Sequence, residues 1–201
     1  MSKPKVCISG GWLWQARHVA LACQERGIPY EFYATFYAKE DGLLYKISRF
    51  LKRLGFSQIE DMLRKRSYPK LNSNHVHNYL TWEILYRILR RTLRDVVSVY
   101  YYINPAYDSW VSNQLNECDI FYGYEDGALF SIQKAKELGA ITILELRSLQ
   151  PLYNEMVEEE ARILGLPTPS YLKSEKLAPV MERKFAEMKV ADYLLVYTSR
   201  F

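Results

Sequence analysis

The segment from Cys118 to Arg147 has the sequence CDIFYGYEDGALFSIQKAKELGAITILELR, in which two β-favouring runs flank a helical pattern. The runs 119–124 and 141–146 are short and mostly apolar, as strands are. Between them, apolar residues recur at helical spacing from Ala128 to Leu138, and Gly139 suits the left-handed position after a helix. The segment therefore predicts a βαβ unit.

Two loops of this unit follow its strands, at residues 123–127 and 147–150. Because the strands of a βαβ unit are parallel, both loops lie at one edge of the sheet, where open α/β folds bind ligands. In the first loop, Glu125 to Gly127 can turn the chain, and Asp126 is expected to be the N-cap of the helix.

The N-terminal residues repeat this pattern. Its predicted parts are a strand at 5–9, a turn at Gly10 and Gly11, a helix at 15–26 and a strand at 29–35. A glycine pair lets the backbone approach a ligand, and the following helix start offers N–H groups to an anion. A purely structural turn explains the pair equally well, so both interpretations stay open.

Composition predicts a single soluble α/β domain over the 201 residues, with an ordinary 49% of hydrophobic residues. The three cysteines are widely spaced without a CxxC motif, which favours buried, reduced thiols in a cytoplasmic protein. The N-terminal apolar run is too short for a signal peptide or a membrane span. The net charge of +4 and the absence of an RNA-binding signature predict no nucleic-acid partner.

Residues 39–101 form a predicted helical insertion with two basic faces. The cations of these faces are Lys46, Arg49, Lys52 and Arg53, followed by Arg87, Arg90, Arg91 and Arg94. Solvated cations on ordinary domain helices are one interpretation. The other is peripheral contact with an anionic membrane, at the inner face of the cell membrane.

Two polar clusters suggest metal chemistry only weakly. His75 and His77 would share one strand face, but no nearby cysteine or pair of carboxylates completes a ligand set. Glutamates from Glu155 to Glu160 crowd a predicted helix that starts at Pro151, and a solvated helix face explains them. We therefore predict no metal site and no cofactor.

Turn and helix signals predict the structure of the remaining segments. Residues 104–108, NPAYD, predict a turn, and residues 109–116 predict a short helix. A last amphipathic helix is expected around residues 177–188, and an apolar strand at 193–197.

Three stretches carry a resemblance to a known family. The run YGYEDGALFSIQKAKELGAITILEL, the ending ERKFAEMKVADYLLVYTSRF, and the opening KVCISGG with RHVALACQERGIPYEFYAT resemble the N-terminal domain of family-4 glycosyltransferases. These enzymes have the GT-B fold, which consists of two Rossmann-like domains. The resemblance covers nearly the whole chain and is loose over the helical insertion.

The resemblance implies transfer of a sugar from a nucleotide-sugar to a glycan or lipid-linked acceptor, with retention at the anomeric carbon and no obligatory metal. In such enzymes the first domain receives the acceptor, and a C-terminal domain, which we expect this chain to lack, holds the nucleotide-sugar. The chain alone is then expected to be inactive. The alternative is a non-catalytic Rossmann-like module that binds a sugar, a membrane or a partner protein.

The same resemblance indicates where an acceptor binds. Many relatives have a histidine after the strand that corresponds to residues 141–146, whereas this chain has Arg147 near that place. Arg147 would hold a hydroxyl group or a phosphate, or form a structural ion pair with Glu125 or Asp126. The candidate substrate-binding residues are Gly10, Gly11, Trp12, Glu125, Asp126, Gly127 and Arg147.

Overall fold

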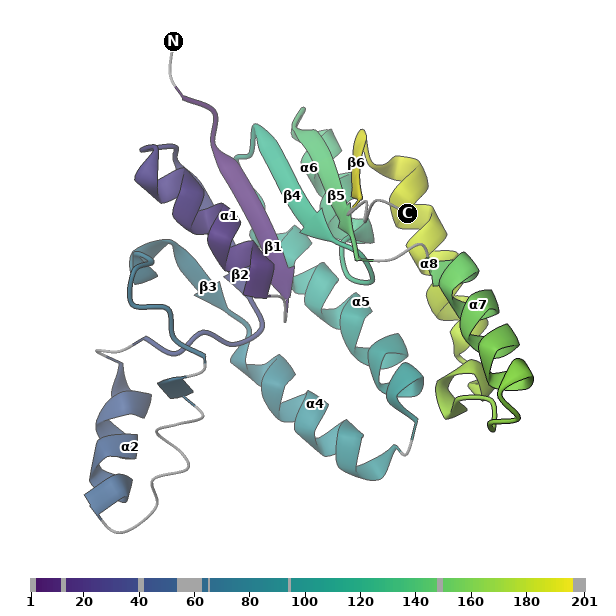
Figure 1. Cartoon of the computed structure of the whole chain (residues 1–201). Coiled ribbons are helices and arrows are strands. Elements are labelled where there is room, and N and C mark those ends of the chain that lie inside the picture. Colours follow the sequence, from purple (N-terminus) through teal and green to yellow (C-terminus); the bar gives the residue numbers. More distant parts are fainter. Residues whose placement is uncertain are drawn as a thin grey trace.

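In the computed structural model, the chain folds around one six-stranded sheet in which every neighbouring pair of strands is parallel (Figure 1). The structure describes residues 3–11, 14–39, 42–53, 63–64, 66–93, 95–147 and 150–196. The strands, in sheet order, are β3 (Val76–Asn78), β2 (Tyr30–Ala34), β1 (Val6–Gly11), β4 (Ile120–Tyr124), β5 (Ile141–Leu146) and β6 (Tyr193–Val196).

Helices and two short 3-10 turns connect these strands. The helices are α1 (Trp14–Glu25), α2 (Leu43–Arg53), α4 (Leu80–Thr92), α5 (Val96–Gln114), α6 (Leu129–Glu137), α7 (Gln150–Ile163) and α8 (Leu177–Val190). The 3-10 turns are η1 (Ser73–His75) and η2 (Ser170–Lys173). None of the helices in the described part of the chain is long and apolar enough to cross a membrane.

Helices pack on both faces of the sheet, so the predicted α/β, Rossmann-like fold is confirmed. On one face, Ala16 and Ala20 of α1 pack against Ile8 and Phe32. On the other face, the buried side chains of α5 and α6 pack against β1, β4 and β5 around Phe121. Side chains alternate between the two faces along each strand, which explains why the strands are apolar throughout.

The order of the strands reverses at β1, which lies between β2 and β4. The chain runs outward from β1 to β3, returns through α4 and α5, and then continues outward through β4 to β6 (Figure 1). Such a reversal leaves a crevice beyond the carboxyl ends of the two central strands. The fold therefore places the loops after β1 and β4 side by side.

The predicted βαβ unit is confirmed, with β5 matching the predicted strand residue for residue. Gly139 has a φ of 81°, as expected of a residue that ends a helix in the left-handed conformation. The N-terminal unit is also confirmed as β1, α1 and β2, but Gly10 and Gly11 complete the strand instead of turning the chain. A shift in register between Ser9 and Gly11 accommodates them.

The predicted turn at residues 104–108 is wrong, because α5 runs through it with Pro105 in its interior. The residues expected to form a separate short helix belong mostly to the same helix. Ile103 and Tyr107, on either side of the proline, are buried against the sheet. Their packing compensates for the one backbone hydrogen bond that a proline removes from a helix.

Candidate functional site

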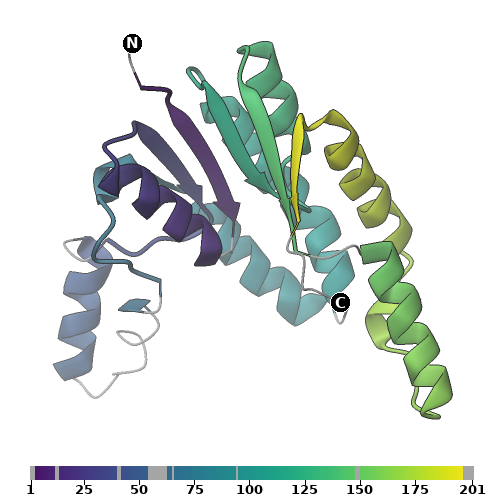
Figure 2. The same cartoon turned by 45° about the horizontal axis from the view of Figure 1, so that its top comes forward.

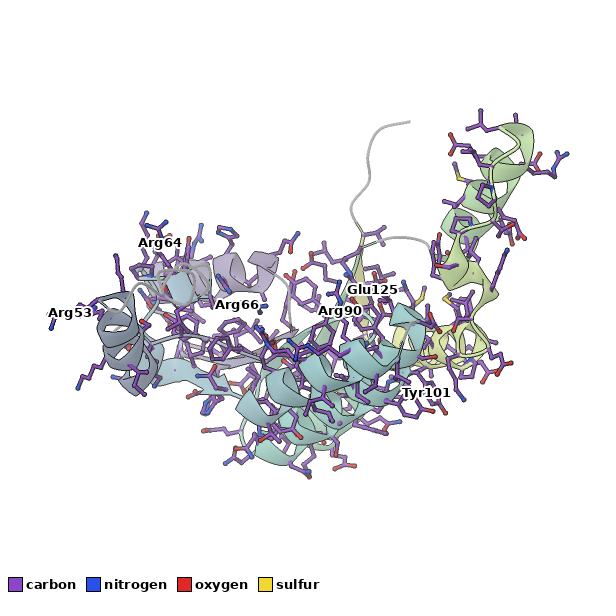
Figure 3. The ribbon with its side chains drawn as sticks, turned by 90° about the horizontal axis from the view of Figure 1, so that it is seen from below. Arg53, Arg64, Arg66, Arg90, Tyr101 and Glu125 are labelled. Atoms are coloured by element: carbon purple, nitrogen blue, oxygen red, sulfur yellow. The ribbon has the colours of Figure 1, made fainter. Side chains whose placement is uncertain are left out.

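A cavity of about 100 Å³ opens at the carboxyl ends of the central strands. Its lining comes from β1, β4 and the loops after β2, β4 and β5, and from α4 and α5, namely Ser9, Gly10, Thr35, Trp82, Tyr100, Asn104, Tyr107, Tyr124, Glu125, Asp126, Gly127 and Arg147. A second cavity of about 560 Å³ adjoins it and shares Tyr100, Glu125, Asp126 and Arg147. Figure 3 looks at this edge of the sheet and labels Glu125.

The structure brings most of the predicted site residues together. Gly10, the loop residues Glu125 to Gly127 and Arg147 all line the first cavity. Gly11 ends β1 but is not part of this lining. Trp12 and Arg94 lie outside the described residues.

Several lining residues were not predicted. Thr35 and Tyr124 lie at or just after the ends of strands, and Ser9 lies two residues before the end of β1, so the rule that located the other loops also applies to them. Trp82 and Tyr107 lie within helices and carry no local signal of a site. They reach the cavity only because α4 and α5 pack beneath the edge of the sheet.

Gly10 is required by packing. A Cβ atom at this position would lie 2.4 Å from Cβ of Ala16 and 2.6 Å from Cε2 of Phe32. Both distances are far shorter than a van der Waals contact, so the absence of a side chain lets α1 approach the sheet. Of the two interpretations of the glycine pair, this geometry favours the structural one at Gly10.

Arg147 forms an ion pair across the two loops, as one of the alternatives predicted. Its Nη2 donates to Oδ2 of Asp126 at 3.1 Å, and its Nε lies 3.3 Å from Oε1 of Glu125. The same Oε1 accepts the backbone N–H of Arg147 at 3.0 Å. The Arg147 side chain is 49% exposed and therefore remains accessible to a ligand.

Glu125 also forms an ion pair with a buried lysine. Nζ of Lys184, on α8, lies 2.5 Å from Oε2 of Glu125, and the two side chains are only 2% and 1% exposed. Both oxygens of Glu125 thus face cations of the protein. Burying such a pair is tolerated because each charge has a close partner, and the result is a rigid support for Arg147.

Asp126 is not the N-cap of α6, contrary to the prediction. It has a φ of 74°, in the left-handed region, and the N-cap is Ala128, which has no side-chain oxygen to offer. The prediction was wrong because two carboxylates from distant helices bind the start of α6. Asp108 of α5 and Glu187 of α8 make these contacts.

These two carboxylates bind the first N–H groups of α6 and of the loop before it. Asp108 accepts from the backbone N–H groups of Phe130 at 2.7 Å and Ser131 at 2.9 Å. Glu187 accepts from the N–H groups of Asp126 at 2.8 Å and Ala128 at 3.0 Å. Three donors of the helix start, the N–H groups of Ala128, Phe130 and Ser131, are therefore satisfied within the chain.

Both carboxylates are fully buried, and Arg183 of α8 lies between them. Its Nη2 donates to Oδ2 of Asp108, and its Nε lies 3.7 Å from Oε1 of Glu187. Burial raises the pKa of Glu187 to about 8, against the opposing effects of the Ala128 N–H and of Arg183. Burial also raises the pKa of Asp108.

The two polar clusters noted in the sequence lie elsewhere. Nε2 of His77 is 2.7 Å from Oε2 of Glu31, and Nδ1 of His75 is 3.7 Å from Oε1 of the same glutamate, so the histidines link β3 and η1 to β2. In the described residues, no group of histidines, cysteines and carboxylates could hold a metal ion. The glutamates of α7 are exposed, and Glu159 pairs with Arg162.

The predicted basic faces are exposed where the structure describes them. Their exposed cations are Lys46, Arg49, Lys52 and Arg53 on α2 and Arg87, Arg90 and Arg91 on α4. Arg87 pairs with Glu83 at 2.8 Å, and Arg90 donates to the hydroxyl group of Tyr86 at 2.7 Å. Large apolar side chains are exposed on the same helices, namely Ile47, Leu85 and Ile88.

Comparison with models of known protein families and with curated proteins returned no match. Among solved structures, the chain is similar to a UDP-glucosyltransferase from Polygonum tinctorium that is capable of glucosylating indoxyl, determined in complex with 3,4-dichloroaniline. The identity is 9% and the TM-score is 0.42, over 98% of this chain and 47% of that one. The chain thus spans about half the length of that protein, and a likeness this distant carries no argument about function.

The fold and the cavity together define a class. The chain is a Rossmann-like α/β protein with a candidate ligand site at the crevice where the strand order reverses. What this site binds has to be argued from its own chemistry.

Proposed function

We propose that the chain is the acceptor-binding half of a retaining glycosyltransferase of the GT-B type, resembling family 4. The whole enzyme moves a sugar from a nucleotide-sugar to a glycan or lipid-linked acceptor. The acceptor occupies the cavity at the carboxyl ends of β1 and β4, and the nucleotide-sugar is held by a further domain outside this chain.

The observation that carries this proposal is the lining of the cavity. Aromatic side chains from α4, α5 and β4 surround a carboxylate and a guanidinium, and they are Trp82, Tyr100, Tyr107 and Tyr124. A sugar has apolar C–H faces that pack on aromatic rings and hydroxyl groups that bind charged partners. Asp126 and Arg147 are the charged pair of this lining that reaches solvent, with side chains 22% and 49% exposed.

The test of acceptor binding uses substitutions in that pair. Arg147→Ala removes the guanidinium, and we expect the affinity for methyl glycosides and short oligosaccharides, measured by calorimetry, to fall roughly tenfold or more, as for a lost charged hydrogen bond. Arg162→Ala is the matched control, because Arg162 makes the same kind of ion pair with Glu159 on α7, in neither cavity. Equal affinities of wild type and Arg147→Ala contradict the proposal.

A second test concerns the donor. We expect the 201-residue chain to release no sugar from a nucleotide-sugar, because the proposal assigns the donor to another domain. A longer product of the native reading frame is expected to bind nucleotide-sugar in calorimetry. Sugar release by the 201-residue chain contradicts the assignment of the donor to another domain. A native product of only 201 residues that binds no nucleotide-sugar favours the alternative, a non-catalytic binding module.

Peripheral membrane contact is a second part of the proposal, and the exposed apolar side chains among the cations favour it. Figure 1 shows α2 and α4 extending beyond the carboxyl ends of the strands, and Figure 3 shows Arg53, Arg64, Arg66 and Arg90 spread along that edge. Ile47 and Ile88 are 44% and 54% exposed beside these cations. Cations flanking exposed apolar residues suit an anionic lipid surface, where a lipid-linked acceptor is held.

Liposome sedimentation tests this contact. Replacement of Arg49, Lys52, Arg87 and Arg91 by glutamate is expected to abolish sedimentation with vesicles that contain anionic phosphatidylserine, because each cation near such a surface contributes about 1 kcal/mol. The control replaces the partly exposed Lys134 and the exposed Lys189, on α6 and α8, by glutamate. Unchanged sedimentation of the first variant refutes membrane contact and leaves acceptor binding untouched.

A further inference from the structure

Carboxyl groups from two other helices, α5 and α8, bind the N-terminus of α6. Four backbone N–H groups of the loop and the first turn, those of Asp126, Ala128, Phe130 and Ser131, donate to carboxylate oxygens at distances of 2.7 to 3.0 Å. The acceptors are Glu187 and Asp108, and both are 0% exposed. Neither residue is part of the cavity lining, so they act on the site through the loop.

The N-terminus of a helix in this position generally favours anions. The N–H groups at the start of a helix that follows a parallel strand attract anions, because they lack partners within the helix and lie at the positive end of its dipole. In many α/β proteins a phosphate of the ligand binds there. Here the side chains of Asp108 and Glu187 take the place of that phosphate.

The charged side chains around the loop are matched in number. Three carboxylates, those of Asp108, Glu125 and Asp126, are matched by three cations, those of Arg183, Lys184 and Arg147. Glu187 adds either no charge or one negative charge, depending on its protonation. The only cation of this group that reaches solvent to a large extent is Arg147, and Asp126 already binds it.

Glu187 also fixes the shape of the loop. Its bond to the N–H of Asp126 holds a non-glycine residue in the left-handed conformation, with a φ of 74°. In that conformation the carboxylate of Asp126 meets Arg147 across the loops. The same interaction thus fills the helix start and orients the charged pair of the cavity.

We propose that Glu187 is a specificity-determining residue, which keeps anionic groups off the loop of residues 125–131 and leaves it to the neutral, hydroxyl-bearing part of a ligand. The consequence for an acceptor rests on the proposed function, whereas the exclusion of anions does not. An anionic group of the acceptor, such as a lipid-linked phosphate, then has to bind away from this helix.

The experiment uses Glu187→Ala in the full chain, with inorganic phosphate and formate as probes. Backbone amide resonances of Asp126 and Ala128 are followed by NMR during each titration. In the variant we expect saturable shifts of both amides, with formate replacing the lost carboxylate, and an affinity on the order of tenfold or more above that of wild type. Glu182→Ala, on the exposed side of α8, is the matched control and should behave as wild type.

A second variant tests the proposal if Glu187→Ala does not fold. Glu187→Gln keeps the size of the side chain but replaces one acceptor oxygen by a donor, so it should free one N–H group and gain a smaller anion response. Saturable shifts of the Asp126 and Ala128 amides in the wild-type chain overturn the proposal, as does their absence in both variants when these are folded. Because sugar binding is not measured, failure here leaves the proposed function standing, and failure of sugar binding leaves this inference standing.

Discussion

Gly10 and Gly127 line the same cavity, yet their surroundings differ. A Cβ atom at Gly10 meets side chains at 2.4 and 2.6 Å, whereas at Gly127 the nearest atom, Cδ1 of Tyr107, is 3.8 Å away. The first distances require neighbours to move, and the last is an ordinary contact. Packing therefore requires a glycine at position 10, whereas the surroundings of Gly127 leave room for a Cβ atom.

We expect Gly10→Ala to lower the free energy of unfolding by about 1–3 kcal/mol, the usual cost of overpacking a core. Gly127→Ala is the control and should change it by less than about 0.5 kcal/mol. Urea unfolding followed by circular dichroism measures both. Equal effects would show that the close approach of α1 to Gly10 is not what constrains this residue.

Glu187 should make stability depend on pH. Its folded pKa of about 8 lies above the usual 4.5, so its contribution is fully present below pH 4.5 and is lost as the pH rises through about 8. Asp108, whose pKa burial also raises, acts in the same direction, whereas Asp192, with a pKa lowered to about 2, does not titrate in this range.

Urea unfolding at several pH values between 5 and 9 tests this dependence. The free energy of unfolding of wild type should fall with increasing pH more steeply than that of Glu187→Gln, because only wild type must ionise a buried carboxyl group at this position. The free energy of unfolding of wild type, measured relative to that of Glu187→Gln, should therefore decrease as the pH rises. Parallel curves would refute the assignment of the slope to Glu187.

The helix α6 depends on side chains from other helices for its start. Asp108, which is itself fully buried, binds two of its N–H groups, the hydroxyl group of Ser131 and the guanidinium of Arg183. By contrast, Asp95 caps α5 nearer the surface, where it accepts from N–H groups of the first turn and from the hydroxyl group of Ser174. A fully buried carboxylate that binds a guanidinium should matter more than this partly exposed cap.

We expect Asp108→Ala to cost about 3–5 kcal/mol of unfolding free energy, because it leaves the mostly covered Arg183 and two N–H groups without their acceptor. Asp95→Ala, the removal of a partly exposed cap, should cost about 0.5–2 kcal/mol. Denaturant unfolding of the two variants measures the ratio. A smaller loss for Asp108→Ala than for Asp95→Ala contradicts this account.

The sheet as a whole is covered unequally on its two faces. Figure 2 shows α1 in front of the first strands, and within the described residues no helix lies in front of β4, β5 and β6. Tyr193 and Leu195 of β6 pair in register with Ile143 and Glu145 and are 61% and 45% exposed. Parallel sheets are usually buried on both faces, so this edge contributes little to stability.

Substitutions on neighbouring strands should reveal this difference. Leu195→Ala is expected to lower the free energy of unfolding by less than about 1 kcal/mol, because much of the side chain is already in water. Leu144→Ala, on β5 and 0% exposed, should cost about 2–5 kcal/mol. Chemical denaturation compares them, and similar losses would mean that β6 is covered in solution.

The chain order of strands and helices followed from local patterns. Apolar runs, helical spacing and the glycine after α6 located both βαβ units, and the topology then brought the loops of Glu125 and Arg147 together. The turn predicted at Pro105 is wrong, because a proline affects the backbone over only a few residues, whereas packing stabilises α5 over its whole length.

The amino-acid sequence was sufficient for the α/β class, the parallel sheet and the edge that bears the cavity, because periodicity and turn chemistry are properties of neighbouring residues. Folding alone brought Asp108 and Glu187 to the start of α6, from 22 residues before Phe130 and 61 residues after Asp126. No local pattern records such contacts. They arise where helices far apart in the chain pack together, and a buried N–H group must find an acceptor wherever the fold supplies one.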